Sequence, residues 1–292
     1  MLRRLILFTT IAMLDIAPAG AAPPAVTPAA SLRAAYDELQ PKLRSNSYGR
    51  PLHLDSRESS SDLKGDMHAV IGHPIDMVGS SLNDSEVWCD ILILHLNTKY
   101  CEAGNAGGRD MLAVNIGKKY DQPLGKTHRV QFDFRVMAAT HDYFSVVLNA
   151  ASGPYGTKNY RILFEAIPLD KGRTFIHLSY SYGFGMTARL AMQTYLGTIG
   201  SAKVGFTETG KDANGQPLYV GGVRGMIERN TMRYFLAIET YLESLAAPAD
   251  ARVEKRLRDW FAAIERYPRQ LHEMEREDYL ATKRREIRRQ QG

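Results

Sequence analysis

The sequence predicts an α+β fold in which antiparallel strands pack against one long helix near the C-terminus. Residues 129–136 (RVQFDFRV) alternate between apolar and polar side chains, a pattern typical of an antiparallel strand with one buried face. Between residues 111 and 184 further strand-like segments follow one another, separated by Gly, Pro or Asp. Residues 222–245 then carry apolar side chains at helical spacing, which predicts a long amphipathic helix.

The other elements follow from local signals. Ser31 is a suitable N-cap for a helix that ends near Asn46, and residues 51–57 and 63–71 have the pattern of paired strands. His73-Pro74 breaks the second strand, and two short helices are expected after it, the second around Trp88. A helical period returns at 186–198, before a glycine-rich passage. The strands expected between these helices are 111–119, 128–138, 142–150, 160–168 and 174–184.

The long helix has two predicted faces. One is an apolar stripe that includes Ile227 and Ile238, and the other is a solvated side. The full stripe is Val223, Ile227, Tyr234, Ile238, Tyr241 and Leu245, and the solvated side is Arg224, Glu228, Arg233 and Glu243.

The first 21 residues have the pattern of a secretory signal peptide. Arg3 and Arg4 precede a short apolar run, and small residues stand at the positions that favour cleavage after Ala21. The run is interrupted by Asp15 and is too short to span a bilayer. Residues 22–30, rich in Pro and Ala, are expected to form a flexible spacer. We therefore expect a periplasmic or secreted protein.

Composition and motifs exclude several classes of function. The 292-residue chain is 44% hydrophobic and 24% charged, as in ordinary globular proteins, with a formal charge of +5. Nucleic acid is not an expected partner of an exported protein. The chain has no Gly-x-Ser-x-Gly nucleophile motif, and Gly104, Gly107 and Gly108 lack the Lys-Ser/Thr of a phosphate-binding loop. No cofactor is expected, and no His cluster has the spacing of metal ligands.

The chain contains two cysteines, Cys89 and Cys101. In an oxidising compartment an even number of cysteines predicts a disulfide bond, here closing a loop of about a dozen residues. Two unpaired buried thiols are the alternative.

Residues 67–92 (MHAVIGHPIDMVGSSLNDSEVWCDIL), together with the order of elements, resemble the START-like (birch-pollen-allergen-like) helix-grip family. That family's pattern of a small-Pro motif, an apolar helix residue and a Trp falls on His73-Pro74, Val78 and Trp88. The resemblance spans about residues 31–245 and implies a curved antiparallel sheet wrapped around the C-terminal helix, with an apolar cavity between them. The insertion at 186–219 and the chain after Pro248 have no counterpart, and a different α+β sandwich remains the alternative.

A curved sheet that closes on one helix favours a site for an apolar ligand. Tyr180 and Tyr182 can offer a hydroxyl to a ligand head group, or can cover the rim of a core. The candidate lining residues, each of which can equally be core, are Val130, Phe132, Phe134, Phe164, Ile227, Tyr234 and Ile238.

His177 is the one weak candidate for catalysis. Ser179 and Ser181 lie on the same side of its strand, and a buried His beside a carboxylate can act as a general base. A structural His is the alternative.

The chain is thus divided into a signal peptide (1–21), a spacer (22–30), a helix-grip domain (31–247) and a charged helical arm (248–292). The leading hypothesis is non-catalytic binding or carriage of an apolar small molecule, a lipid, in the periplasm. The alternatives are a cyclase or dehydratase on the same scaffold and a module that docks a membrane complex. Peripheral contact with an anionic membrane is assigned to the basic residues Lys283, Arg284, Arg285, Arg288 and Arg289, for which a solvated helix face is the alternative.

Overall fold

The computed structural model describes residues 27–186, 189–190 and 203–291. The predicted signal peptide and most of the predicted helix at 186–198 lie outside the described residues. The large elements in chain order are α1 (Pro28–Arg44), β1 (Leu52–Glu58), β2 (Asp62–Ile71), α2 (Ile75–Leu82), α3 (Ser85–Leu92), β3 (Thr98–Ala106), β4 (Arg109–Ile116), β5 (His128–Ala139), β6 (Phe144–Ser152), β7 (Thr157–Pro168), β8 (Thr174–Phe184), α5 (Gly222–Ser244), α6 (Arg252–Ile264), α7 (Pro268–Leu271) and α8 (Arg276–Gln291).

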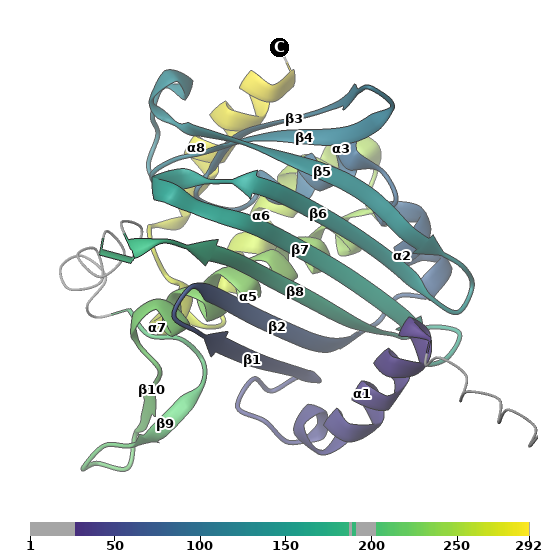
Figure 1. The fold of residues 1–292 in the computed structure, drawn as a ribbon, viewed down its shortest axis with the longest axis vertical. Coiled ribbons are helices and arrows are strands. Elements are labelled where there is room, and N and C mark those ends of the chain that lie inside the picture. The colour runs from purple at the N-terminus through teal and green to yellow at the C-terminus, as the bar shows by residue number, and fades with distance from the viewer. Residues whose placement is uncertain (1–26, 187–188, 191–202, 292) are drawn as a thin grey trace, which may run out of the picture.

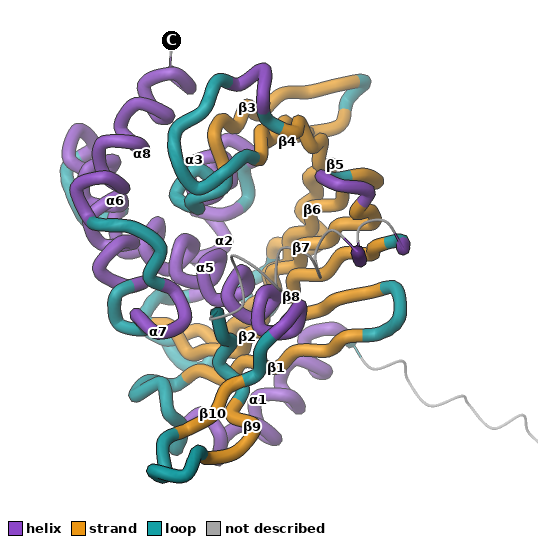
Figure 2. Tube along the Cα trace, turned by 90° about the vertical axis from the view of Figure 1, so that its left-hand side faces the viewer, coloured by secondary structure: helices purple, strands orange, loops and turns teal. Residues whose placement is uncertain are grey.

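The expected helix-grip arrangement is confirmed. Eight strands form one antiparallel sheet in the order β1-β2-β8-β7-β6-β5-β4-β3. The sheet curves in front of α5 in Figure 1, and the side view in Figure 2 shows the strands and the C-terminal helices as two layers. α2 and α3 connect β2, which lies next to the edge strand β1, to β3 at the opposite edge of the sheet.

The close approach of α5 to the sheet depends on a small residue in β2. A Cβ atom at Gly65 would lie 2.2 Å from Oγ1 of Thr231 on α5, so only glycine allows the helix to lie this close. Leu63 and Met67, the inward-facing neighbours of Gly65 on β2, are fully buried. The contact therefore places α5 directly over β2.

The helix α5 is buried on more sides than its amphipathic pattern predicts. Glu228 and Arg233 were assigned to the solvated side, but Glu228 is 0% and Arg233 is 3% exposed. The carboxylate of Glu228 accepts hydrogen bonds from the backbone N–H groups of Phe206 and Thr207, at 2.6 and 2.9 Å, and from the hydroxyl of Ser56. The prediction was wrong because segments distant in sequence cover this face and supply polar partners.

Of the predicted charged arm (248–292), the described residues up to Gln291 form the helices α6, α7 and α8, which pack against the rest of the fold. Leu257, Trp260 and Leu271 are completely buried and belong to the same core as the sheet and α5. Trp260 stacks on Tyr279 of α8 with ring centroids 5.1 Å apart. These helices therefore form a second layer behind α5.

Strand β3 was not predicted, although the pair Gly107-Gly108 indicates the turn that joins it to β4. Both glycines have positive φ values, 62° and 79°, and they form the two-residue turn between β3 and β4. The predicted disulfide is present between Cys89 of α3 and Cys101 of β3. It ties the second short helix to the outermost strand of the sheet.

A small helical patch covers the outer face of the sheet. Leu32, Leu39 and Leu43 of α1 pack with Ile167 and Phe175 in a separate apolar cluster. The sheet consequently has an inner face toward α5 and an outer face that α1 covers only in part.

Candidate functional site

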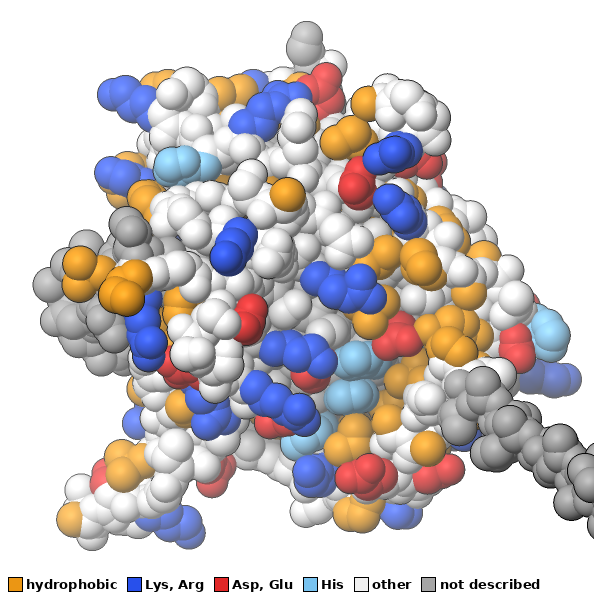
Figure 3. Space-filling view, in the orientation of Figure 1, with side chains coloured by type: hydrophobic (Ala, Val, Ile, Leu, Met, Phe, Trp, Pro, Cys, Tyr) orange, Lys and Arg blue, Asp and Glu red, His pale blue; other side chains and the backbone are white. Residues whose placement is uncertain are grey.

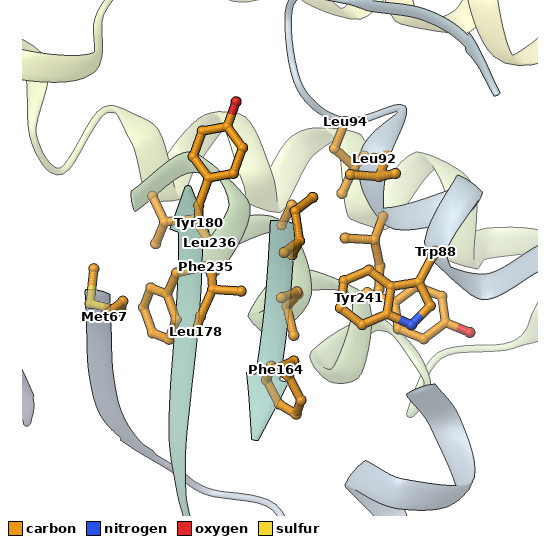
Figure 4. Packing of buried hydrophobic residues seen from close by; sticks show 14 of the residues in the cluster. Met67, Trp88, Leu92, Leu94, Phe164, Leu178, Tyr180, Phe235, Leu236 and Tyr241 are labelled. Carbon is orange, nitrogen blue, oxygen red and sulfur yellow. The ribbon is translucent and has the colours of Figure 1, made fainter. Parts of the chain in front are cut away.

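The interior between the sheet and α5 has an apolar end that side chains fill. Trp88 is 1% exposed, donates its indole N–H to the carbonyl oxygen of Leu82 at 3.0 Å, and lies against Phe134 and Phe164. The ring centroids of Trp88 are 6.5 Å from Phe134 and 6.4 Å from Phe164. Figure 4 shows Trp88 and Phe164 together with Leu92 of α3 and Leu236 of α5. This end is a packed core.

The other end of the interior contains a group of polar aromatic side chains, the tyrosine–histidine cluster. It consists of Tyr160 of β7, Tyr180 and Tyr182 of β8, Tyr234 of α5, and His95 from the segment between α3 and β3. Successive rings lie close together: Tyr160 to Tyr182 at 5.0 Å, Tyr180 to Tyr234 at 5.1 Å, and Tyr234 to His95 at 5.1 Å. Strand alternation turns Tyr180 and Tyr182 inward, and Figure 4 shows the hydroxyl of Tyr180 pointing away from the apolar side chains around Leu178.

Burial keeps these tyrosines protonated. Desolvation raises the pKa of Tyr180, Tyr182 and Tyr234 above the ordinary value, and a hydrogen bond between the side chains of Tyr180 and Tyr234 raises the pKa of Tyr180 further, so the three hydroxyls stay protonated near pH 7. Tyr234 nevertheless keeps accessible surface, because its side chain is half-buried and not buried.

His95 supplies a second kind of donor to the same place. It is 4% exposed, and desolvation holds its pKa well below the ordinary value, so the ring is neutral near pH 7. Its Nδ1 accepts the backbone N–H of Asn97 at 3.1 Å, which places the ring proton on Nε2. Nε2 makes no hydrogen bond of ordinary geometry to a described residue, although the Asn230 side chain is near. A buried donor without an acceptor is costly unless a bound molecule supplies one.

The predicted lining residues are divided between the two ends. Phe134 and Phe164 lie in the packed end, whereas Tyr234 belongs to the tyrosine–histidine cluster and Phe132 lies 6.3 Å from Tyr160. The remaining three, Val130, Ile227 and Ile238, are at most 1% exposed in the same core. Contact of these seven residues with a ligand stays a prediction.

Two members of the cluster were not proposed from the sequence. Tyr160 has a signal, because it alternates with Ile162 and Phe164 on the inward face of its strand. His95 has none, because it lies in an irregular segment whose direction depends on the disulfide and on α8.

A surface groove lies beside the tyrosine end. It has a volume of about 280 Å³, and its walls include Phe184, Val220 and Val223 at the end of β8 and the start of α5. Phe184 follows Tyr182 by two residues on the same inward face of β8. The groove is therefore next to the end of the interior that contains the tyrosine–histidine cluster. A second groove of about 310 Å³ runs along the disulfide, between α3, β3, α6 and α8.

His177 lies on the outer face of the sheet, opposite the interior. Its Nε2 is 2.9 Å from Asp66 and its Nδ1 is 2.9 Å from Glu165, and its ring stacks on His68 at 4.4 Å. Burial acts to lower the pKa of His177, but hydrogen bonds and attraction from the two carboxylates outweigh it and raise the pKa. The two carboxylates therefore hold His177 in place across three strands. In Figure 3 histidine side chains are visible on this face among charged side chains.

The basic residues near the C-terminus do not form one free surface. Lys283 is 1% exposed, and its Nζ donates to the carbonyl oxygens of His95 and Thr98 and to Glu286, each at 2.7 Å. Burial lowers the pKa of Lys283 to about 8. Arg284 forms an ion pair with Glu254 at 2.5 Å, whereas Arg285 and Arg288 are exposed and Arg289 is half-buried. The assignment of Lys283 to a membrane surface was wrong, because its charge is used inside the fold.

Neither a metal centre nor a membrane span is found in the described ranges. No group of His, Cys, Asp or Glu side chains in residues 27–186, 189–190 and 203–291 has the arrangement of a metal site. None of the helices in these ranges has the length and apolar character needed to cross a bilayer.

Comparisons with known proteins reach the chain only through solved structures; no family model and no curated protein matches it. Norcoclaurine synthase from Thalictrum flavum is 14% identical, with 49% of this chain and 83% of that chain covered and a TM-score of 0.34. The Zhui aromatase/cyclase from Streptomyces sp. R1128 is 11% identical over 74% of this chain and 96% of that chain, with a TM-score of 0.32. A protein from Thermus thermophilus is 11% identical over 63% of this chain and 99% of that chain, with a TM-score of 0.41. Similarity at this level says nothing about ligand or activity, and the helix-grip fold rests on the strand order and the position of α5.

Proposed function

We propose that this protein binds a largely apolar small molecule, a lipid, between the sheet and α5 and carries it in the periplasm without changing it chemically. The observation that supports this proposal is the tyrosine–histidine cluster at one end of an otherwise apolar interior. A core that served only stability would be more stable with phenylalanine in place of these tyrosines, because a buried polar group costs free energy unless it is hydrogen-bonded. Donors that converge in an apolar space are the usual arrangement for orienting an apolar ligand.

The cluster and the packed end suggest how the ligand lies. The hydroxyls of Tyr180 and Tyr234 and Nε2 of His95 would meet the polar end of the molecule, and Phe132 with the neighbouring apolar side chains would meet its tail. The groove at Phe184 and Val223 is a route of entry next to the cluster. Location in the periplasm rests on the predicted signal peptide alone.

The test is retention of a ligand by the purified protein. Organic extraction followed by mass spectrometry should recover a stoichiometric lipid, and a neutral fluorescent probe such as N-phenylnaphthylamine should bind and be displaced by that lipid. Tyr180→Phe and Tyr234→Phe should each weaken binding about tenfold, the effect of losing one hydrogen bond of about 1.4 kcal/mol. Tyr143→Phe is the matched control, because its hydroxyl donates to Glu165 at 2.5 Å on the outer face. The absence of any bound molecule from several expression hosts, with no probe binding, would contradict the proposal.

A cyclase or dehydratase is the second candidate, and one observation favours it. A neutral His95 and protonated tyrosine hydroxyls lie side by side, so a base and proton donors are present at one place. Material extracted from a His95→Gln variant should then lose the mass of one water when it is incubated with the unmodified protein. An unchanged mass would leave carriage as the function.

A further inference from the structure

The most highly charged place next to the tyrosine–histidine cluster is a group of three cations around one carboxylate. The carboxylate of Glu273 forms three ion pairs. Its Oε2 is 2.6 Å from Nζ of Lys119 and 3.2 Å from Nζ of Lys203, and its Oε1 is 2.8 Å from the guanidinium of Arg233. We call Arg233, Lys119, Lys203 and Glu273 the cationic cluster. Its formal charge is +2, since one carboxylate faces three positive side chains.

This charge lies in a partly dry environment. The side chains of Arg233 and Glu273 are 4% and 6% exposed, whereas those of Lys119 and Lys203 are 30% and 29% exposed. Desolvation, together with repulsion from Arg233 and Lys203, lowers the pKa of Lys119 despite the attraction of Glu273. The cluster thus extends from the surface toward the interior, with its two lysines partly exposed and its arginine and carboxylate buried.

The cationic cluster is adjacent to the proposed ligand site. Arg233 precedes Tyr234 on α5, and its positive charge acts on both Tyr234 and His95. The charge of Lys119 also acts on His95. His95 provides an independent sign of a missing partner, because its buried Nε2 is without an acceptor among the described residues. Both features would be satisfied by negatively charged oxygen atoms placed between Nε2 and the cations.

We propose that the bound molecule is an anionic amphiphile whose carboxylate or phosphate head group lies between His95 and the cationic cluster. This inference rests on the proposed function and specifies its ligand class. The head group would accept a hydrogen bond from Nε2–H of His95 and would lie against the positive charges of Arg233, Lys119 and Lys203. The tail would extend past Tyr234 and Tyr180 into the space between the sheet and α5.

Three ligands with the same tail test the head group. Dodecanoate, dodecyl phosphate and dodecanol are used to displace N-phenylnaphthylamine from the full chain. We expect at least one of the two anions to bind about tenfold or more tightly than dodecanol, an interaction of about 1.4 kcal/mol. Equal displacement by the three ligands would overturn the anionic head group while leaving the proposed function intact. Failure of all three, with no co-purified lipid, would instead overturn the proposed function.

Charge variants locate the head group. Lys119→Met and Lys203→Met, at partly exposed positions, should each reduce the preference for the anion over dodecanol severalfold. Lys64→Met is the matched control, because Lys64 pairs with Asp66 on the outer face at 2.9 Å. Glu273→Gln should strengthen anion binding, which a merely structural cluster would not do. An unchanged preference for the anion in both lysine variants would refute this location of the head group. The test does not require a substitution of the buried Arg233.

Discussion

The imidazole ring of His95 lies on the phenol ring of Tyr234, with centroids 5.1 Å apart and an angle of 28° between the planes. One residue comes from the irregular segment after α3 and the other from the middle of α5. Their contact joins the part of the chain that the disulfide closes to the helix that the sheet surrounds. The proposed polar end of the ligand site is built on this contact.

His95 should remain neutral at pH values where an ordinary histidine becomes protonated. Desolvation lowers the pKa of His95 in the folded protein. As the pH falls below about 6.5, His95 therefore becomes protonated in the unfolded chain while it stays neutral in the folded chain. The contribution of His95 to stability is therefore complete above pH 6.5 and declines as the pH falls below that value. Imidazole NMR signals recorded against pH should show His177 titrating above 6.5 while His95 does not titrate at that pH. Titration of His95 at its ordinary value would contradict its enclosure.

The outer-face group of His177, Asp66 and Glu165 should stabilise the fold in a limited range of pH. The pKa of His177 is raised, so its contribution is complete below about pH 6.5 and is lost as the pH rises through the folded value. Burial acts to raise the pKa of both carboxyls, but hydrogen bonds from His177 and from Lys64 or Tyr143 outweigh it and lower the pKa. The carboxylate contributions are thus present above about pH 4.5 and are lost as the pH falls.

The substitution His177→Gln should therefore cost about 1–3 kcal/mol at pH 5.5 and clearly less at pH 9, where the histidine is uncharged in both states. Urea unfolding at the two pH values measures the difference. Binding of the neutral probe should not change, because His177 faces away from the interior. Equal losses at both pH values would show that charge pairing is not the source of the stability.

Glu228 and Glu243 form a matched pair on α5 with opposite environments. Glu228 is 0% exposed and accepts four hydrogen bonds, from the backbone N–H groups of Phe206 and Thr207 and from the hydroxyls of Ser56 and Thr207. Glu228→Gln should cost about 2–4 kcal/mol, because the amide cannot accept all four. Glu243 is exposed, and Glu243→Gln should stay within about 0.5 kcal/mol of the unmodified protein. Chemical denaturation of both variants gives the comparison, and similar losses in both would contradict the assignment of Glu228.

The disulfide should matter for binding as well as for stability. The loop between Cys89 and Cys101 contains His95, and its closure contributes about 3 kcal/mol in the chain-entropy model. The double variant Cys89→Ala/Cys101→Ala should lose about that amount in urea unfolding. It should also bind the neutral probe more weakly, since the segment that carries His95 is no longer tied to α3 and β3. Reduction of the unmodified protein should reproduce both changes. A loss of stability with unaltered probe binding would separate His95 from the ligand site.

The sequence was sufficient to predict the elements whose environment repeats along the chain. Strand β5 and helix α5 are recognisable because successive residues of each meet the same apolar layer, so their hydrophobic period is visible locally. The disulfide was predictable from two cysteines alone. Strand β3 was missed because four of its residues, Glu102, Gly104, Asn105 and Ala106, are exposed and leave little alternation to detect.

Only the tertiary structure decided which polar side chains are buried. Glu228, Arg233 and Lys283 read as solvated positions in a helix, and each is buried because a segment far away in the chain supplies its partner. His177 reads as a possible base, and only strand pairing shows that Asp66 and Glu165 hold it on the outer face. His95 has no local signal, since its burial depends on α3, α5 and α8 together. Apolar periodicity is a property of one segment, whereas the burial of a charge or a hydrogen-bonding group is a property of the segments that meet around it.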